Sequence, residues 1–254
     1  MALPGIIVGL IFYTIKDYKT VNLTKTERAS DSQDISKKMK IKDIFFQFTK
    51  TRSLVLTYLA FAACLFVTTS LMSWLPTYFH RMEDLSMSQA GIKSGIVMML
   101  AIIGAPLGGY LADKWRTRRA NARMVFCAIS SLISSVIFFV AFSFLSGTPQ
   151  YILMLFGGIA IVAFVPAGAA VTQDVVHPGL RAISYSICVV VQHILGSSTG
   201  PIVIGAISDA YDIQTAMLIL PGFTVIAAGL FMLGSRYYEK DLAAVERVTL
   251  SIEE

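Results

Sequence analysis

Six runs of mostly apolar residues constrain this chain more than any other feature of its sequence. A helix needs about 20 apolar residues to cross the hydrocarbon core of a bilayer, and each run meets that length. Lipid offers no partners to backbone polar groups, and the runs lack the period-2 alternation of a membrane barrel, so each is predicted to be a helix. The runs cover 54–79, 88–112, 123–145, 151–175, 181–208 and 215–237.

The composition agrees with this interpretation. Hydrophobic residues make up 55% of the 254 residues and charged residues only 15%, which lies outside the range of ordinary soluble domains. The sequence therefore predicts an all-α membrane protein, a six-transmembrane-helix bundle. We expect no enzyme activity and no catalytic residues, because the chain carries no HExxH metal motif and no acid at mid-membrane depth.

The positions of Lys and Arg predict the orientation of the bundle, because these residues concentrate in short cytoplasmic loops. Only Arg81 and Lys93 lie near one face of the predicted membrane domain. The other nineteen of the 21 Lys and Arg residues lie in 16–52, 113–123 and 236–254 or at Arg181. We therefore expect a multi-pass protein, in the inner membrane if the source is bacterial, with the 16–53 loop and the C-terminus in the cytoplasm.

The chain is expected to divide into four segments. Residues 1–15 are apolar but too short to span a membrane, so we interpret them as the end of a truncated transmembrane helix. Residues 16–53 form a central loop, whose second part is basic and amphipathic and is expected either to lie on the anionic inner leaflet or to pack on its own protein. The six-helix bundle over 54–237 and a tail over 238–254 follow.

The residues inside the predicted membrane domain limit its chemistry. All 16 Asp and Glu residues lie in loops or at helix ends, so an intramembrane carboxylate that carries a proton or sodium ion is not predicted in this chain. Cys64, Cys127 and Cys188 lie one to a run without paired spacing, which favours small buried side chains over a disulfide or a metal site. We expect no cofactor and no metal.

The run 181–208 differs from the others, because Gln192 and His193 stand together near its middle. On a helix, Gln192 shares a face with Tyr185 and Cys188, and His193 shares the neighbouring face with Ser186. An unpaired amide or imidazole in hydrocarbon costs several kcal/mol, so both must face other helices or a water-filled cavity. Two interpretations remain open: hydrogen bonds between helices, or a cavity that binds substrate, which two adjacent bulky polar groups favour.

Two stretches resemble a known family. Residues 109–119, GYLADKWRTRR, resemble the loop motif G-x-L-a-D-[RK]-x-G-R-[RK] of the major facilitator superfamily, with departures at Arg116 and Thr117. Residues 181–209 resemble the eleventh helix of that superfamily, with GPIVIG and Ser-Asp near its end. The sequence SWLPTYF, the arginines of RANAR, and the His-x-x-Gly at His193 are most similar to the spinster-like branch.

This resemblance implies the C-terminal half of a twelve-helix secondary transporter. Such proteins bind substrate between two six-helix halves that rock to alternate access. The implied partners are an N-terminal six-helix half, membrane lipids and a small-molecule or lipid substrate, and no nucleic acid. Spinster-like members export lipids, so the implied substrate is a lipid or an amphipathic organic anion. The alternatives are a carrier of another small solute, such as a drug, sugar or organic acid, and a membrane interaction module that transports nothing.

Two sets of candidate site residues follow. Polar and adaptable side chains of three runs are the candidates for substrate binding: Gln192, His193, Ser197, Ser198, Thr69, Trp74 and Met98. The resemblance also implies a set that acts in conformational gating: Asp113, Lys114, Arg118, Arg181 and Asp209. In this set Asp113 is expected at a helix N-terminus of the other half, where the helix dipole favours an anion.

Overall fold

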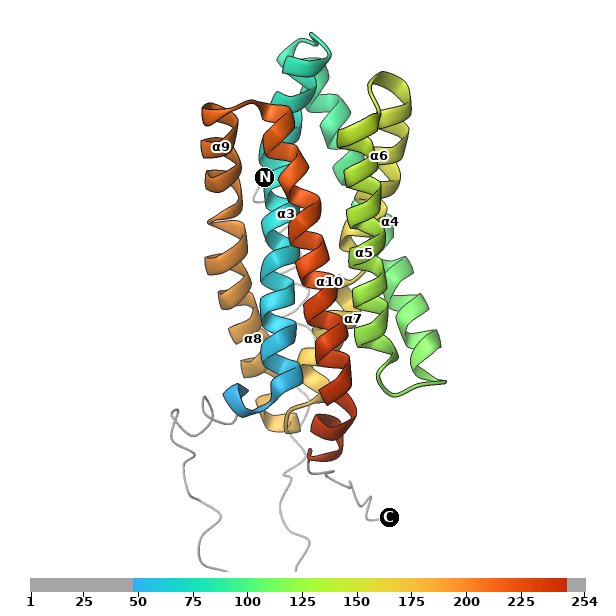
Figure 1. Ribbon diagram of the computed structural model, residues 1–254. Helices are drawn as coiled ribbons and strands as arrows, with labels where there is room; N and C mark the ends of the chain where they lie inside the picture. The colour runs from blue at the N-terminus through green and yellow to red at the C-terminus, as the bar shows by residue number, and fades with distance from the viewer. Residues whose placement is uncertain (1–47, 246–254) are drawn as a thin grey trace, which may run out of the picture. The chain divides into compact units, whose positions relative to one another are not determined.

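Long helices joined by short turns make up most of the computed structural model, which describes residues 48–245 (Figure 1). No β-strand occurs within these residues. The elements are α3 (Arg52–Met82), α4 (Met87–Arg116), α5 (Ala122–Phe144), α6 (Gly147–Val162), α7 (Val165–Asp174), η1 (Pro178–Leu180), α8 (Arg181–Gln192), η2 (His193–Ser197), α9 (Gly200–Ala210) and α10 (Ile213–Ala243).

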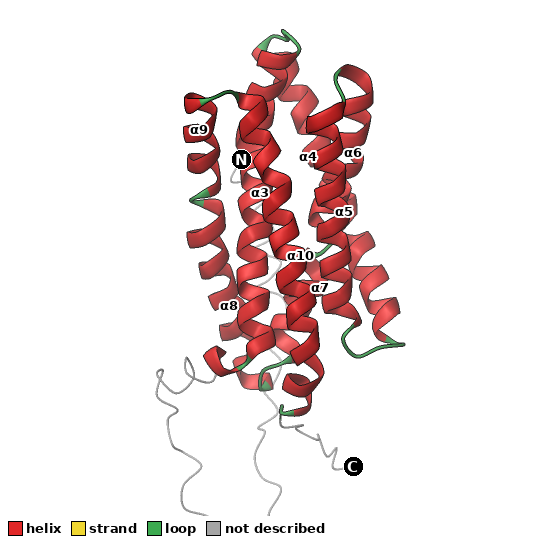
Figure 2. Ribbon diagram, in the orientation of Figure 1, coloured by secondary structure: helices red, strands yellow, loops and turns green. Residues whose placement is uncertain are grey.

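Six helical stretches are long and apolar enough to cross a membrane, which confirms the predicted all-α membrane fold. Four of these spans are the single helices α3, α4, α5 and α10. The fourth span in chain order, Gly147–Asp174, joins α6 and α7, and the fifth, Pro178–Ala210, joins η1, α8, η2 and α9. Short non-helical links at these interruptions are visible in Figure 2.

The limits of the bundle differ slightly from those expected. Residues 1–15, most of the 16–53 loop and the end of the tail lie outside the described residues. Helix α3 begins at Arg52, and α10 continues beyond residue 237 to Ala243. The extension of α10 has a packing role, because Tyr238 is fully buried and the Asp241 carboxylate accepts hydrogen bonds from the N–H (2.9 Å) and hydroxyl (2.6 Å) of Ser53.

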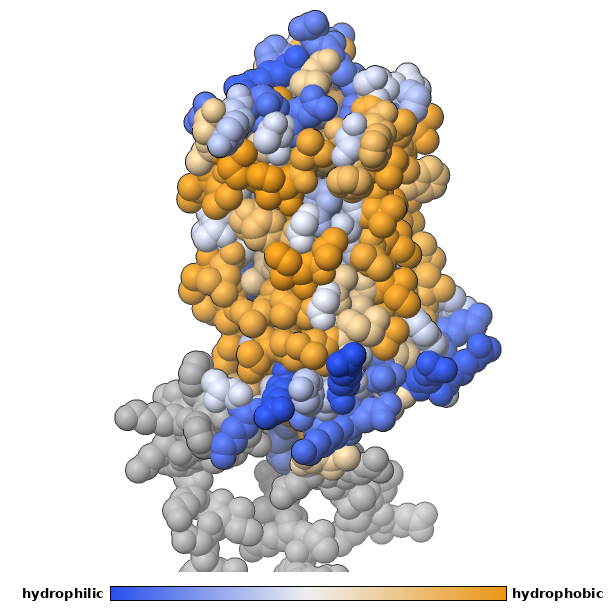
Figure 3. All heavy atoms as spheres, viewed as in Figure 1, coloured by the Kyte–Doolittle hydropathy of each residue, from blue (hydrophilic) through white to orange (hydrophobic). Residues whose placement is uncertain are grey.

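The end of the bundle where α3 begins and α4 and α10 end carries most of the described cations, and we call it the basic end. The Ser53–Asp241 hydrogen bonds join the start of α3 to the end of α10 there. At the opposite end, Asp212 begins α10 by accepting bonds from the N–H (2.7 Å) and hydroxyl (2.8 Å) of Thr215, which lowers the pKa of its carboxyl. Between the ends, the visible face is mainly apolar (Figure 3).

Helix α3 is the most enclosed span, with 67% of its apolar window buried. Near the basic end, the ring of Phe61 lies 5.1 Å from that of Phe164 and 6.3 Å from that of Phe231. Toward the other end, Tyr78 lies 5.3 Å from Phe142 in a second core cluster. Aromatic side chains of α3 therefore contact the interrupted fourth span, α5 and α10, and α3 is the central helix of this packing.

Close backbone contact joins α4 to the fourth span. A Cβ atom on Gly104 would lie 2.1 Å from the carbonyl oxygen of Ile159, and one on Gly108 would lie 2.0 Å from that of Ala163. Small residues of this kind allow membrane helices to approach until their backbones touch. The two glycines are therefore requirements of helix packing in α4.

Candidate functional site: an interrupted span and a charge cluster

The fifth span changes its helical geometry at the candidate substrate residues. Helix α8 ends at Gln192, and the π-helix η2 covers His193–Ser197. The Ser198 N–H donates to the His193 carbonyl at 3.0 Å, one residue farther along the chain than in an α-helix. Pro201 lies in the first turn of α9 and has no N–H to donate. The run 181–208 is thus two helices with a π-helical joint, not the continuous helix expected from sequence.

Side chains satisfy the backbone carbonyls around this joint. The Ser198 hydroxyl donates to the His193 carbonyl at 2.9 Å, and the Thr199 hydroxyl donates to that of Leu195 at 2.6 Å. From α3, the indole N–H of Trp74 donates to the Pro201 carbonyl at 2.9 Å. Ser198 and Trp74 were both expected to contact substrate, but the structure uses their donors to brace the broken helix.

One face of the joint packs directly on α3. A Cβ atom on Gly196 would lie 2.4 Å from the Ala62 carbonyl oxygen, and one on Gly200 would lie 2.6 Å from that of Phe66. Cys188 of α8 is fully buried on the same side. Gly196, Gly200 and Cys188 therefore belong to the packed face of the span, although Cys188 was predicted to share a face with Gln192.

His193 lies on the exposed face of the joint, and Gln192 and Ser197 are half-buried beside it. Within residues 48–245, neither the Gln192 amide nor the His193 imidazole makes a hydrogen bond to another side chain or to the backbone. A purely structural role would require such bonds, because unpaired polar groups in hydrocarbon are costly. The geometry leaves both side chains able to bind a ligand.

The other two candidates for substrate binding lie on neighbouring helices. The Thr69 hydroxyl of α3 donates to the Leu65 carbonyl of its own helix at 2.7 Å, so its donor is already used. Met98 of α4 is half-buried and packs against the second core cluster. The structure shows no bond that brings either residue together with His193.

Residues 196–200, GSSTG, match the letters of the serine hydrolase pattern GxSxG. That motif works at a sharp turn between a strand and a helix, where the serine hydroxyl is free to attack. Here the same residues run from a π-helix into α9, and the hydroxyl of the middle serine is bonded to the His193 carbonyl. The match therefore has no catalytic geometry.

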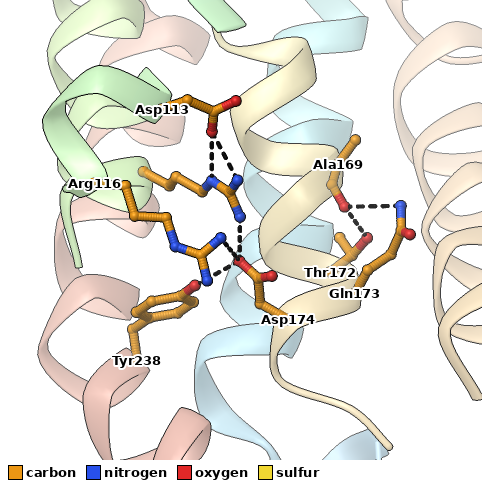
Figure 4. Close-up of polar contacts among 8 residues, drawn as sticks. Asp113, Arg116, Ala169, Thr172, Gln173, Asp174 and Tyr238 are labelled. Atoms are coloured by element: carbon orange, nitrogen blue, oxygen red, sulfur yellow. Dashed lines mark hydrogen bonds and ion pairs between the residues drawn. The ribbon is translucent and has the colours of Figure 1, made fainter. Parts of the chain in front are cut away.

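A charge cluster at the basic end joins four helices (Figure 4). The Asp174 carboxylate at the end of α7 accepts hydrogen bonds from Arg123 of α5 at 2.6 Å and from the Tyr238 hydroxyl of α10 at 2.8 Å. Arg116 of α4 approaches the same carboxylate at 3.5 Å. Arg123 also donates twice to one carboxylate oxygen of Asp113, at 3.0 and 2.7 Å.

The two carboxylates of the cluster differ in burial. The side chains of Arg123 and Asp174 are 13% and 18% exposed, whereas that of Asp113 is 64% exposed. Removing one partner of a largely buried pair leaves an uncompensated charge and is costly, but an exposed pair contributes little. Arg123 and Asp174 therefore form the structural centre of the cluster, and Asp113 presents its second oxygen to the surroundings.

Of the residues predicted to act in gating, only Asp113 belongs to this cluster. Lys114 lies 5.8 Å from the centroid of the Tyr110 ring, and Arg118 and Arg181 are exposed. Asp209 ends α9 at the opposite end of the bundle, next to Ser208, whose hydroxyl accepts from Arg81. No functional role was predicted for the other four members of the cluster: Arg116, Arg123, Asp174 and Tyr238. A signal for two of them was present, since Arg123 begins one apolar run and Asp174 ends another on the same predicted side.

Residues 48–245 thus hold six stretches able to cross a membrane, one of them interrupted beside an imidazole that has no hydrogen-bond partner there, and this is the architecture of a multi-pass membrane protein. The chain belongs to the Major Facilitator Superfamily, whose family model matches residues 1–197. The predicted resemblance to this superfamily is therefore confirmed, and its members are transporters rather than enzymes, as expected.

The relatives that the chain matches are of the spinster type, in agreement with the predicted resemblance. The chain is 28% identical over 227 residues to protein spinster homolog 3 of Danio rerio, a match that covers 79% of this chain and 46% of that protein. It is 27% identical over 229 residues to the sphingosine-1-phosphate transporter SPNS2 of Mus musculus, covering 78% of this chain and 41% of the relative. The chain thus spans about half the length of the curated relatives it matches.

A solved structure supports the fold. The crystal structure of a bacterial homolog to the human lysosomal transporter spinster, in an inward-facing and unoccupied conformation, superposes with a TM-score of 0.71 at 22% identity. The match covers 94% of this chain and 58% of that one. At this level of identity the likeness shows the fold alone.

Proposed function

We propose that this chain is the C-terminal half of a secondary transporter that moves a lipid or amphipathic organic anion by alternating access. The observation that carries the proposal is the π-helical joint, which exposes the His193 imidazole in mid-span without a bonding partner among the described residues. The relative SPNS2 is named as a sphingosine-1-phosphate transporter, which supports an anionic lipid substrate. The missing wall of the binding cavity would come from an N-terminal six-helix half.

In this proposal, His193 binds the anionic head group of the substrate, and Gln192 and Ser197 add hydrogen bonds. An imidazole N–H can donate a hydrogen bond to an anionic oxygen of the head group. Val190 and Ile194 are exposed on the same helix surface and would contact the apolar part of the substrate. Trp74 and Ser198 support the site indirectly, because they hold the joint in place.

The charge cluster is proposed to control the conformational cycle. Arg123 and Asp174 hold four helices together at the basic end, while Asp113 presents a free carboxylate oxygen from an exposed side chain. A contact between Asp113 and the other half would form in one state of the cycle and break in the next. We propose that the basic end lies in the cytoplasm, with the 16–53 loop and the C-terminus, because Lys and Arg concentrate there.

The experiment that tests the substrate site measures two quantities on the same variants. In liposomes that contain the chain assembled with its N-terminal half, His193→Ala should lower transport per folded molecule by about tenfold, or about 1.4 kcal/mol. His193→Gln keeps a hydrogen-bond donor but removes the imidazole ring, so it separates hydrogen bonding from the other properties of the ring. Ser186→Ala is the matched control, because that exposed hydroxyl already donates to the Ala182 carbonyl. Lower thermal stability with unchanged transport per folded molecule would refute the substrate site.

A further inference from the structure

Three exposed cations lie where α3 begins and α10 ends: Arg52, Arg236 and Lys240. The Arg52 guanidinium lies 5.3 Å from the centroid of the Tyr237 ring, which places it beside the last turns of α10. Within residues 48–245, none of the three lies within 4.0 Å of a carboxylate oxygen. We call these three residues the cation rim.

Two carboxylates near the cation rim are engaged elsewhere, and the third, the exposed Glu239, lies more than 4.0 Å from all three cations. Asp241 accepts both of its hydrogen bonds from Ser53, and Asp174 is shared by Arg123 and Tyr238. Arg236 and Lys240 stand four residues apart on one helix, a spacing at which like charges repel. An anion placed between them would relieve this repulsion.

An apolar stripe of α10 leads directly to the cation rim. Val225, Ile226, Met232 and Leu233 are exposed along this helix. Positions 225, 229, 232, 236 and 240 follow helical spacing, so the stripe and the two cations of α10 lie on one face. A Cβ atom on Gly229 would meet nothing within 4 Å, which leaves open space in the middle of the stripe. The surface thus consists of an apolar stripe of α10 that ends at the cation rim.

We propose that this surface binds one anionic phospholipid of the surrounding leaflet. Its phosphate would contact Arg52, Arg236 and Lys240, and an acyl chain would lie along the stripe past Gly229. Arg116 and Arg123 at the basic end are less suited, because they already pair with carboxylates. The proposal does not depend on the substrate site, since it uses neither η2 nor the charge cluster.

The test compares lipid binding by variants of the purified chain. In detergent micelles at physiological salt, the wild-type chain should bind dioleoyl-phosphatidylglycerol about a hundredfold more tightly than dioleoyl-phosphatidylcholine, because three cations each contribute about fivefold. Each removed cation should lower the affinity for phosphatidylglycerol by about fivefold. The triple variant Arg52→Gln, Arg236→Gln, Lys240→Gln should therefore bind the two lipids equally. Circular dichroism and elution volume confirm that the variants remain folded.

A matched variant removes the same charge from another part of the basic end. Lys114→Gln, Arg118→Gln, Arg119→Gln should keep the preference for phosphatidylglycerol within about twofold of the wild-type value. Equal losses in both triple variants would overturn the proposal, because binding would then follow net charge alone. Competition by glycerol phosphate at the same concentration as the lipid would also overturn it, by showing a site for a free phosphate. A fivefold gain in lipid affinity on deletion of 246–254 would assign the cation rim to the chain's own acidic tail instead.

Discussion

Helix α4 and the fifth span are the least enclosed parts of the bundle, each with 22% of its apolar window buried, yet their exposed faces differ in chemistry. The stripe of exposed residues along α4 is apolar over its whole length: Ile92, Ile96, Met99, Ile103, Leu107 and Tyr110. The corresponding stripe of the fifth span alternates polar and apolar residues: Ser186, Val190, His193, Ile194, Ser198 and Ile202. The two spans are equally exposed, but the side chains they expose differ. These side chains predict an apolar neighbour for α4 and a partly polar neighbour for the fifth span.

The two spans are also held in different ways. At one end of α4, Lys93 pairs with Glu83 and lies 4.7 Å from the ring centroids of both Phe79 and Tyr151. At the other end, Asp113 pairs with Arg123. Ion pairs thus fix both ends of α4 across its turns. The fifth span is held by hydrogen bonds instead, from the Tyr58 hydroxyl to the Ser184 carbonyl at 2.9 Å and from Trp74 to Pro201.

The largest expected effect concerns the packed side of α4. Gly104→Val would force a side chain against the Ile159 carbonyl, which is backbone and cannot rotate away. We expect a loss of about 3 kcal/mol in the free energy of unfolding, at the upper end of overpacking effects. Gly95→Val is the control, because a Cβ atom on Gly95 would meet nothing within 4 Å. Thermal unfolding of both variants in detergent measures the difference, and equal stability would show that α4 is not held by backbone contact.

A second effect distinguishes the two exposed faces directly. Ile102 is 71% exposed near the middle of α4, and Ile102→Lys should cost about 2–3 kcal/mol, because a charge there would face an apolar environment. His193→Lys places the same charge at mid-span on the other face and should cost less than about 1 kcal/mol if that face borders water. Folded yield and thermal stability in lipid nanodiscs measure both variants. Equal losses would remove the distinction between the two faces.

A smaller effect tests how the joint is braced. Trp74→Phe keeps an aromatic ring beside Gly205 but removes the donor to the Pro201 carbonyl, which would cost about 1 kcal/mol. Trp115→Phe is the control, since no hydrogen bond of the Trp115 indole occurs among the described residues. Stability should fall in the first variant only. A loss of transport in Trp74→Phe at full stability would instead place Trp74 in contact with substrate.

The number of membrane spans and their order could be predicted from the sequence, because lipid imposes the same requirement for length and apolar character on every span. Each run needed only about 20 apolar residues to be recognised, and six were found. The depth of His193 was predictable for the same reason, since it lies in the middle of such a run. Its environment was not, because Gly196 and Gly200 place the π-helical joint against the backbone of α3, and the sequence does not show which helix packs there.

The charge cluster shows the same limit. A cation at the start of one run and an acid at the end of another are visible in the sequence, but their pairing depends on which helices are neighbours in space. Arg123 and Asp174 are separated by two complete spans, and Tyr238 comes from the last helix. The loop motif drew attention to Asp113 because its spacing is local. Sequence therefore identified the exposed member of the cluster and not the buried ones.

The smallest effect on stability is expected at Asp113, at the end of α4. Asp113→Asn keeps an oxygen that can accept from Arg123 and removes a charge that is 64% exposed, so the free energy of unfolding should change by less than about 1 kcal/mol. If the carboxylate makes a contact that forms and breaks during the cycle, turnover of the assembled transporter should fall severalfold while substrate affinity stays within a few fold. Arg123→Gln provides the contrast, because it leaves the largely buried Asp174 without its closest cation and should lower stability by about 3 kcal/mol. Initial rates and binding isotherms on the same preparations separate the two roles. A large loss of affinity in Asp113→Asn at unchanged turnover would place Asp113 in substrate binding and would make both exposed spans part of one site.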